Sequence, residues 1–328
     1  MIAFIKELIR WNEWGDSKLP FIFIAWMLAS INKYSIFGNL GPLLAVVLFS
    51  GCFLAFGYLY NDWLDREADK HAGKIKLVQN LPGWRVSLYL GVLVILSLIV
   101  LLPWFSNPIV IAVISLCYFC AITYSGPWFR FKERGSLGLL VSSISQRSLP
   151  AGLIFAILGE YNIAAAIYLC LTLIIGFRWM LIHQIDDYEK DSLSQIKTYT
   201  LKKGKDSSLK TSYLLFHLEI ILLVILAFLL NYPPVWIIYL AYFLFTILIS
   251  VATASTPWQM LTMPSSAYLV LSDFYFLYWP IGLAVLLSLQ NFIFFFVLLI
   301  LLFLLSRQIT QHINALKHLL VISKAKIT

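Results

Sequence analysis

The sequence predicts an all-α polytopic membrane protein: one domain, residues 1–328, with nine or ten transmembrane helices. Three observations indicate this class. The chain is 61% hydrophobic and only 12% charged, whereas soluble domains carry about 25% charged residues. Apolar runs of about 20 residues, the length of a membrane-crossing helix, recur along the whole chain. Basic residues gather in alternate loops, and no linker divides the chain.

The first 18 residues mix charges with Ile, Phe, Leu and Trp, and they lack the apolar core and small-residue cleavage site of a signal peptide. We expect an interfacial amphipathic helix over 1–18, leading into the first span. The expected spans are 19–37, 41–60, 85–102, 108–124, 138–158, 162–182, 212–230, 234–252, 267–287 and 290–306. So few residues separate the last two that nine spans is the alternative.

The distribution of Lys and Arg predicts the orientation. With a cytoplasmic N-terminus, the loops after the even-numbered spans face the cytoplasm. They hold Lys70, Lys74, Lys76, Arg130, Lys132, Arg134, Lys190, Lys197, Lys202, Lys203, Lys205 and Lys210. The basic tail 307–328 lies on the same side. We therefore expect a multi-pass protein of the cell (inner) membrane, and we attribute the net charge of +8 to topology and to contact with anionic membrane lipids, with no nucleic-acid partner.

An acidic cluster follows the second apolar run in the stretch YNDWLDREAD, Tyr60 to Asp69. Asp62, Asp65 and Asp69 are spaced by three and four residues, so they share one helical face, with Asn61 beside them.

A second cluster, HQIDDYEKD, ends the sixth span. Asp187 and Asp191 are four residues apart, and His183 lies one turn earlier. Clustered carboxylates repel one another unless a cation neutralises them, and hard oxygen ligands favour Mg²⁺, which often bridges to substrate phosphates. The candidate catalytic residues and metal ligands are Asn61, Asp62, Asp65, Asp69, Asp187 and Asp191. The alternative, acids that only end the spans in the headgroup layer, is disfavoured by the helix dipole.

A metal-bound diphosphate also needs cationic and hydroxyl partners. The loop YSGPWFRFKERG offers Tyr124 and Lys132, although its basic residues also serve topology. Arg147 and Arg178 fall inside predicted spans, where an arginine usually faces a polar interior. The diphosphate-binding candidates are therefore Asn61, Tyr124, Lys132, Arg147 and Arg178. Interhelical hydrogen bonding is as plausible as catalysis for His217, Glu219 and Asp273.

These motifs resemble those of the UbiA-type intramembrane prenyltransferase superfamily. Asn61, Asp62, Asp65 and Asp69 match the family pattern NDxxDxxxD, Asp187 and Asp191 match DxxxD, and YSGPWFRFK is similar to the family's Tyr-Ser/Thr-x-Pro…Lys segment. The resemblance implies a helical bundle whose central cavity opens to the bilayer. It also implies Mg²⁺-dependent transfer of a prenyl group from a prenyl diphosphate donor to a hydrophobic acceptor, with one Mg²⁺ at each motif and Lys132 on the diphosphate.

One departure concerns pathway. The stretch KHAGKIKLVQNLPG stands where many quinone-pathway members carry Pro-x-Arg-Pro, so no particular pathway is predicted. The acceptor can be an aromatic compound, a quinone precursor or a lipid. A terpene cyclase, which uses the same metal motifs without an acceptor, is the alternative enzyme. A transporter would show Gly- or Pro-broken spans at mid-depth, and a CDP-alcohol phosphotransferase would need an Asp-rich signature that this sequence lacks.

Overall fold

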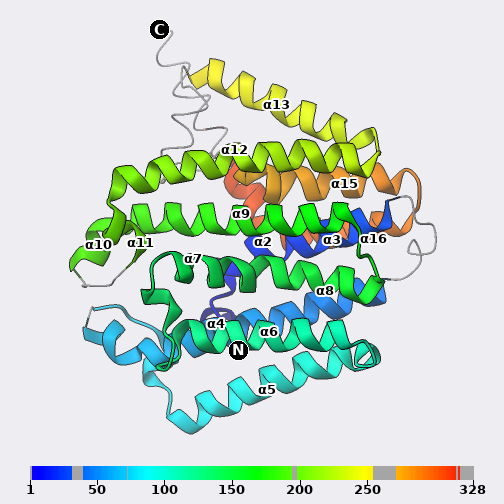
Figure 1. The fold of residues 1–328 in the computed structure, drawn as a ribbon. Coiled ribbons are helices and arrows are strands. Elements are labelled where there is room, and N and C mark those ends of the chain that lie inside the picture. Colours follow the sequence, from blue (N-terminus) through cyan, green and yellow to red (C-terminus); the bar gives the residue numbers. More distant parts are fainter. Residues whose placement is uncertain are drawn as a thin grey trace.

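The computed structural model describes residues 2–31, 40–71, 73–193, 198–253, 271–314 and 317. These residues form helices and connections without any strand (Figure 1). The elements are α1 (Ile2–Leu8), α2 (Trp11–Lys18), α3 (Pro20–Ser30), α4 (Gly41–His71), η1 (Leu77–Asn80), α5 (Gly83–Leu101), η2 (Leu102–Trp104), α6 (Pro108–Ser125), η3 (Phe131–Glu133), α7 (Ser136–Ser143), η4 (Ile144–Ser148), α8 (Leu149–Leu158), α9 (Ile163–Asp186), α10 (Tyr188–Leu193), α11 (Tyr199–Lys203), α12 (Lys205–Leu230), α13 (Pro234–Thr253), η5 (Phe274–Tyr278), α15 (Trp279–Ser288) and α16 (Ile293–Leu304).

Each of the ten expected spans overlaps a helix, although 32–39 and 254–270 lie outside the described residues, so the first and ninth are seen only in part. Within the described part of the chain, six helices are long and apolar enough to cross a membrane: α4, α5 with η2, α6, α7 through α8, α9 and α12. A seventh is the pair Ile293–Leu304 and Ser306–Asn314, which is bent by 62°. Pro234–Ile249 and Phe274–Ser288 are apolar but shorter. The all-helical membrane fold is confirmed, while a count of nine or ten spans stays a prediction.

The N-terminal segment differs from the single helix expected over 1–18. Arg10 adopts a left-handed conformation (φ 54°) and separates α1 from α2. The side chains of α1 are mostly exposed, as an interfacial helix requires, but α2 buries Trp14 and Asp16 in the bundle. Asp16 forms a two-bond ion pair with Arg307, whose NH2 also donates to the carbonyl of Asn12. This pairing holds α2 against the segment that follows α16.

The core of the bundle is built around α3. All of its side chains are buried, and it packs against α4, α8, α9 and α15. Aromatic rings fill this region, with Tyr168 on α9 packed against Trp279 on α15 at 5.8 Å between centroids. By contrast, α5 buries only Val86, Ser97 and Leu101, and it runs along the edge of the bundle (Figure 1). An apolar helix with so little buried surface is expected to face lipid.

The polar connections gather at one end of the bundle, on the left in Figure 1. These are the segments between α4 and α5, between α6 and α7, and around α10 and α11. A hydrogen bond of 3.4 Å from Lys202 Nζ to the Glu133 carbonyl joins the last two. Both acidic motifs therefore emerge where the long loops meet.

A pocket of about 530 Å³ lies among α3, α8, α9 and the end of α12, where Glu160 and Leu230 line it. None of the predicted site residues lines this pocket. The expected central cavity stays a prediction.

Candidate active site

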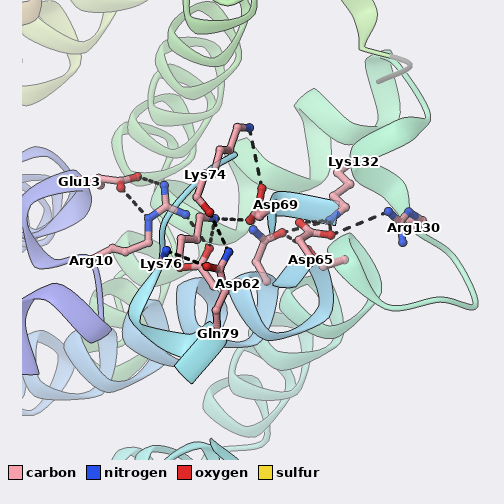
Figure 2. A network of polar contacts seen from close by, with 12 residues as sticks. Arg10, Glu13, Asp62, Asp65, Asp69, Lys74, Lys76, Gln79, Arg130 and Lys132 are labelled. Atoms are coloured by element: carbon pink, nitrogen blue, oxygen red, sulfur yellow. Dashed lines mark hydrogen bonds and ion pairs between the residues drawn. The ribbon is translucent and has the colours of Figure 1, made fainter. Parts of the chain in front are cut away.

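The first acidic motif lies on the last turns of α4, which continues unbroken to His71. Because the helix does not end at the apolar run, Asp62, Asp65 and Asp69 share one face, as the spacing predicts. Asp62 and Asp69 are only 4% and 9% exposed. Buried carboxylates need charged partners, and basic residues reach these three from two sides of the helix (Figure 2).

Lys76 and Arg10 approach from one side. Lys76 Nζ lies 2.5 Å from Asp62 Oδ1 and 2.7 Å from Asp69 Oδ2, so one ammonium bridges two motif acids. Arg10 NH1 contacts the same Asp62 oxygen at 3.0 Å while its other nitrogens bind Glu13. Burial lowers the pKa of Lys76, but the Asp62 and Asp69 carboxylates outweigh it and leave that pKa raised.

Lys132 approaches from the other side. Its Nζ lies 2.5 Å from both carboxylate oxygens of Asp65 and 3.3 Å from Asn61 Oδ1. Arg130 reaches the same carboxylate at 3.8 Å, and Ser125 Oγ donates to Asn61 Oδ1. Burial holds the pKa of Lys132 below its ordinary value, even though the charge and hydrogen bond of Asp65 raise it. The predicted neighbourhood of Asn61, Asp65 and Lys132 is thus present.

Gly138 fixes the position of Lys132. A Cβ at Gly138 would lie 2.6 Å from the Phe131 carbonyl oxygen and 3.2 Å from Lys132 Cα. Only glycine lets η3 fold this closely onto α7, and this approach directs Lys132 toward α4. Tyr124 lies in the last turn of α6, next to Ser125.

The second motif crosses the junction of α9 and α10. The Asp187 N–H bonds to the His183 carbonyl at 3.0 Å, and the Asp191 N–H bonds to the Asp187 carbonyl at 2.8 Å. These bonds continue the helical pattern across the junction, but Asp187 itself (φ −85°, ψ 6°) separates α9 from α10, so one stripe of His183, Asp187 and Asp191 stays a prediction. His183 Nδ1 lies 3.5 Å from Asp187 Oδ2.

The structure brings some predicted residues together and separates others. Within the described ranges, no group of three or more His, Cys, Asp or Glu side chains is gathered closely enough to hold a metal ion. Arg178 forms hydrogen bonds of 2.6 and 2.9 Å with Glu219, and both side chains are fully buried. Arg147 lies in η4 over the ring of Phe21, 5.7 Å from its centroid. A diphosphate role for either arginine stays a prediction.

Sequence reasoning missed Arg10 and Lys76 as site residues. Arg10 belongs to the segment expected to lie in the interface, and Lys76 was counted only as a topology signal. Lys76 follows the end of α4 closely in the sequence. A loop this short can fold back and place a lysine beside the last turns of the helix, so this closeness in sequence could have identified Lys76.

In the described structure the α4 acids bind basic side chains and are not gathered around a metal-sized site, but the chemistry of these oxygen donors suits a divalent cation. Three carboxylates and one amide lie on one face of a helix, and Asp62 Oδ1 is already shared by an ammonium and a guanidinium. Such a hard oxygen set fits Mg²⁺ better than softer metals. Asn61, Asp62, Asp65 and Asp69 would hold one ion, and Asp187 with Asp191 would supply further oxygen ligands.

Comparison with known proteins identifies the family of this chain. The model of the UbiA prenyltransferase family matches residues 19–263. The chain belongs to the UbiA prenyltransferase family. Among curated relatives of this UbiA protein, protoheme IX farnesyltransferase 2 of Pseudomonas paraeruginosa and its counterpart in Pseudomonas aeruginosa are each 28% identical over 160 residues, 46% of this chain and 53% of the relative. The chain spans about half the length of these relatives.

Solved structures support the same fold for this UbiA family member. A UbiA homologue from Archaeoglobus fulgidus, bound to DMAPP and Mg²⁺, aligns with a TM-score of 0.61 at 19% identity, covering 86% of this chain and 98% of that one. The same homologue bound to GPP and Mg²⁺ gives the same values. A structure of digeranylgeranylglyceryl phosphate synthase aligns with a TM-score of 0.59 at 16% identity, covering 86% and 96%.

Proposed function

We propose that this protein transfers a prenyl group from a prenyl diphosphate to a hydrophobic acceptor within the membrane, with Mg²⁺, and releases diphosphate. The observation that carries the proposal is the α4 face. There Asp62, Asp65 and Asp69 each form an ion pair with a lysine from another segment of the chain. Carboxylates and mobile cations on one surface are what a metal-bound diphosphate requires. Relatives that bind DMAPP or GPP with Mg²⁺ lend support.

Each group has a distinct part in this proposal. Bound Mg²⁺ would neutralise charge on the diphosphate as the carbon–oxygen bond breaks. Asp62, Asp65 and Asp69 would hold the ion from α4, and Asp187 and Asp191, at the junction of α9 and α10, would supply further oxygen ligands for the metal.

The basic side chains that bind the motif acids exchange these acids for the diphosphate in the same step. Lys132 leaves Asp65 and binds the leaving diphosphate, and Lys76 and Arg10 do the same from the other side of α4. The developing negative charge is thereby met by fixed donors, which lowers the barrier. Tyr124 and Asn61 orient the diphosphate through hydrogen bonds.

The acceptor then attacks the allylic carbon and its proton passes to a base. We place this chemistry at the cytoplasmic face of the cell membrane, because the loops at this end carry the basic residues. Burial of the reacting carbon among apolar helices excludes water, so hydrolysis of the donor is suppressed.

The test is a matched pair of substitutions on α4. Asp62→Asn should weaken Mg²⁺-dependent GPP binding by more than about 100-fold, since Asp62 is buried on the motif face. Glu67→Gln is the control, because Glu67 lies between the motif acids but is exposed and its carboxylate pairs with the neighbouring Arg66. Asp187→Asn should resemble Asp62→Asn. Binding that survives both aspartate substitutions would refute the site.

The products distinguish a prenyl transfer from a cyclisation. Purified protein in nanodiscs is incubated with Mg²⁺ and GPP, with and without a lipid extract of the source cells. Diphosphate release is measured, and the products are identified by mass spectrometry. Diphosphate release that needs the extract and yields a prenylated compound supports transfer. Release without extract, giving a hydrocarbon, would identify a cyclase instead.

A further inference from the structure

Arg307, in the helix Ser306–Asn314 that follows α16, is bound to α2 near the other end of the chain. Two of its guanidinium nitrogens donate to the two carboxylate oxygens of Asp16, at 2.7 and 2.8 Å, and one of them also donates to the Asn12 carbonyl. Asp16 is only 3% exposed. A two-bond pair of arginine and carboxylate fixes orientation as well as distance. We call these contacts of Arg307 with Asp16 and Asn12 the α2 clamp.

The α2 clamp acts on the turn that follows Arg10. Asn12 lies two residues after Arg10, and Arg10 contacts Asp62 of the first motif at 3.0 Å. The backbone of Arg10 is left-handed (φ 54°), a conformation that a residue with a side chain keeps only where its surroundings hold it. Trp14 contributes to this, since its ring nitrogen donates to the Ile9 carbonyl at 2.7 Å. Arg10 therefore reaches Asp62 from a backbone that α2 fixes.

The two ends of α2 are held by different segments. Lys18, its last residue, donates to the hydroxyl of Tyr58 on α4. Arg307 holds the first turn through the Asn12 carbonyl and the middle of the helix through Asp16. Loss of Arg307 would leave the last turn of α2 on α4 and would free the first turn, which is the end next to Arg10.

The α2 clamp lies outside the part of the chain that the family model matches. That match covers residues 19–263, whereas Arg10 and Asp16 come before it and Arg307 comes after it. The family match therefore assigns no role to these three residues, and their contacts are the guide to what they do.

We propose that Arg307 is a positioning residue for donor binding: by holding α2 it keeps the Arg10 guanidinium beside Asp62, where that guanidinium can bind the diphosphate. The proposal rests on the proposed function, in which Arg10 exchanges Asp62 for the diphosphate. An arginine that is held in place before the donor arrives loses less conformational freedom on binding. Arg307 itself stays bound to α2, so its effect on the donor passes through Arg10.

The test is a double-mutant cycle on the full chain in nanodiscs, with Mg²⁺-dependent GPP binding as the readout. Arg10→Gln should weaken binding by about 10-fold, the effect of one charged hydrogen bond. Arg307→Gln should weaken it by about 3- to 10-fold, and the double variant should bind within about twofold of Arg10→Gln. Losses that multiply in the double variant would show that Arg307 does not act through Arg10, and they would overturn the proposal.

Asp16→Asn separates the α2 clamp from a general effect of charge. Removal of an acid raises the net charge, which by itself favours binding of an anionic donor. The α2 clamp predicts the opposite, a loss of about 3- to 10-fold, because Arg307 loses its two-bond partner. Tighter or unchanged GPP binding in Asp16→Asn would overturn the proposal.

Lys317→Gln is the matched control for a lost positive charge, since Lys317 is exposed and belongs to the same C-terminal segment as Arg307. Its GPP binding should stay within about twofold of wild type, because an exposed charge away from the site is screened. A loss as large as that in Arg307→Gln would attribute both effects to charge alone and would count against the α2 clamp.

Thermal unfolding without ligand shows which variants are folded. A merely structural role for Arg307 predicts a lower midpoint in Arg307→Gln with unchanged GPP binding by the folded protein, and that result would also overturn the proposal. If Arg307→Gln does not fold, Arg307→Lys takes its place in the cycle, because lysine keeps the charge but not the two-bond geometry. Wild type that binds no GPP would count against the proposed function. Wild-type binding that does not respond to changes at Arg307 or Asp16 would count against the α2 clamp alone.

Discussion

Lys76 Nζ lies 2.5 Å from Asp62 Oδ1, in the position beside the motif acid that a metal ion would take. The same ammonium lies 2.7 Å from Asp69. A divalent cation that binds these oxygens must first displace the lysine.

Lys76→Met should therefore tighten metal binding in the absence of donor. We expect Mn²⁺ affinity, measured by electron paramagnetic resonance, to rise by about 3- to 10-fold, because the competing ammonium is gone. The KM for GPP should rise at the same time, because the diphosphate loses a cation. Lys74→Met is the control: Lys74 is half exposed and lies 3.9 Å from Asp69. Unchanged or weaker Mn²⁺ binding in Lys76→Met would contradict the displacement.

Lys132 should set the alkaline limit of activity. Burial lowers its pKa below the ordinary lysine value, and only the charged form attracts diphosphate. As pH rises through this lowered pKa, the ammonium loses its proton and kcat/KM falls, at a pH below roughly 10.4. Lys132→Arg should move that limb upward because guanidinium stays charged. A limb that stays in place in Lys132→Arg would assign it to another group, and Lys202→Arg serves as the control.

Gly138 tests whether the approach of η3 to α7 positions Lys132. Gly138→Ala introduces a Cβ 2.6 Å from a backbone oxygen, so the loop must shift. A shift near 1 Å can cost up to about 100-fold in kcat/KM. Gly152→Ala is matched, since its nearest atoms lie at 3.7 Å on a side chain, and it should keep full activity. Equal activity of both variants would show that the loop adapts freely.

Arg178 and Glu219 should matter for stability. Glu219→Gln or Arg178→Met leaves a buried charge unpaired and should cost about 3–5 kcal/mol. Tyr275, which donates to Glu219 at 3.1 Å, would lose its acceptor in a Glu219→Met variant. The double change to methionine should recover much of the loss. Unfolding in detergent measures all four variants, and additive losses in the double methionine variant would show that the pair is not coupled.

The spacing of the acidic residues in the sequence was sufficient to predict that the first motif lies on one helical face. The spacing of Asp62, Asp65 and Asp69 predicts one face if the helix continues, and α4 continues. Lys132 is predicted from its place on the basic loop between the two acidic motifs and from the similarity of that loop to the family's segment. Arg10 and Lys76 were not found, because a basic residue serves topology and a tertiary ion pair equally well in sequence. Which role dominates depends on how α2 and the segment after α4 fold back, and that is decided by contacts such as Asp16 with Arg307.

The sequence also did not predict which residues Arg147 and Arg178 contact. Arg178 precedes Asp187 by nine residues, which places the two on different faces of a helix, but the sequence gives no sign that Glu219 from another helix is the partner of Arg178. The split of the N-terminal segment at Arg10 also has no strong local signal, since arginine rarely adopts the left-handed conformation.

Two spans contain a π-helix, Ile144–Ser148 and Phe274–Tyr278, and each is followed at once by a proline-bearing helix. A π-turn accommodates one residue more than an α-turn, so each segment behaves as a one-residue insertion kept within a span. Deleting a single residue there would rotate one half of the span by about 100° relative to the other. Arg147 or Tyr275 would then leave its present neighbours while the hydrophobicity of the span hardly changed. The length of these two segments, which no hydropathy profile registers, is therefore under tighter constraint than the identity of most residues within them.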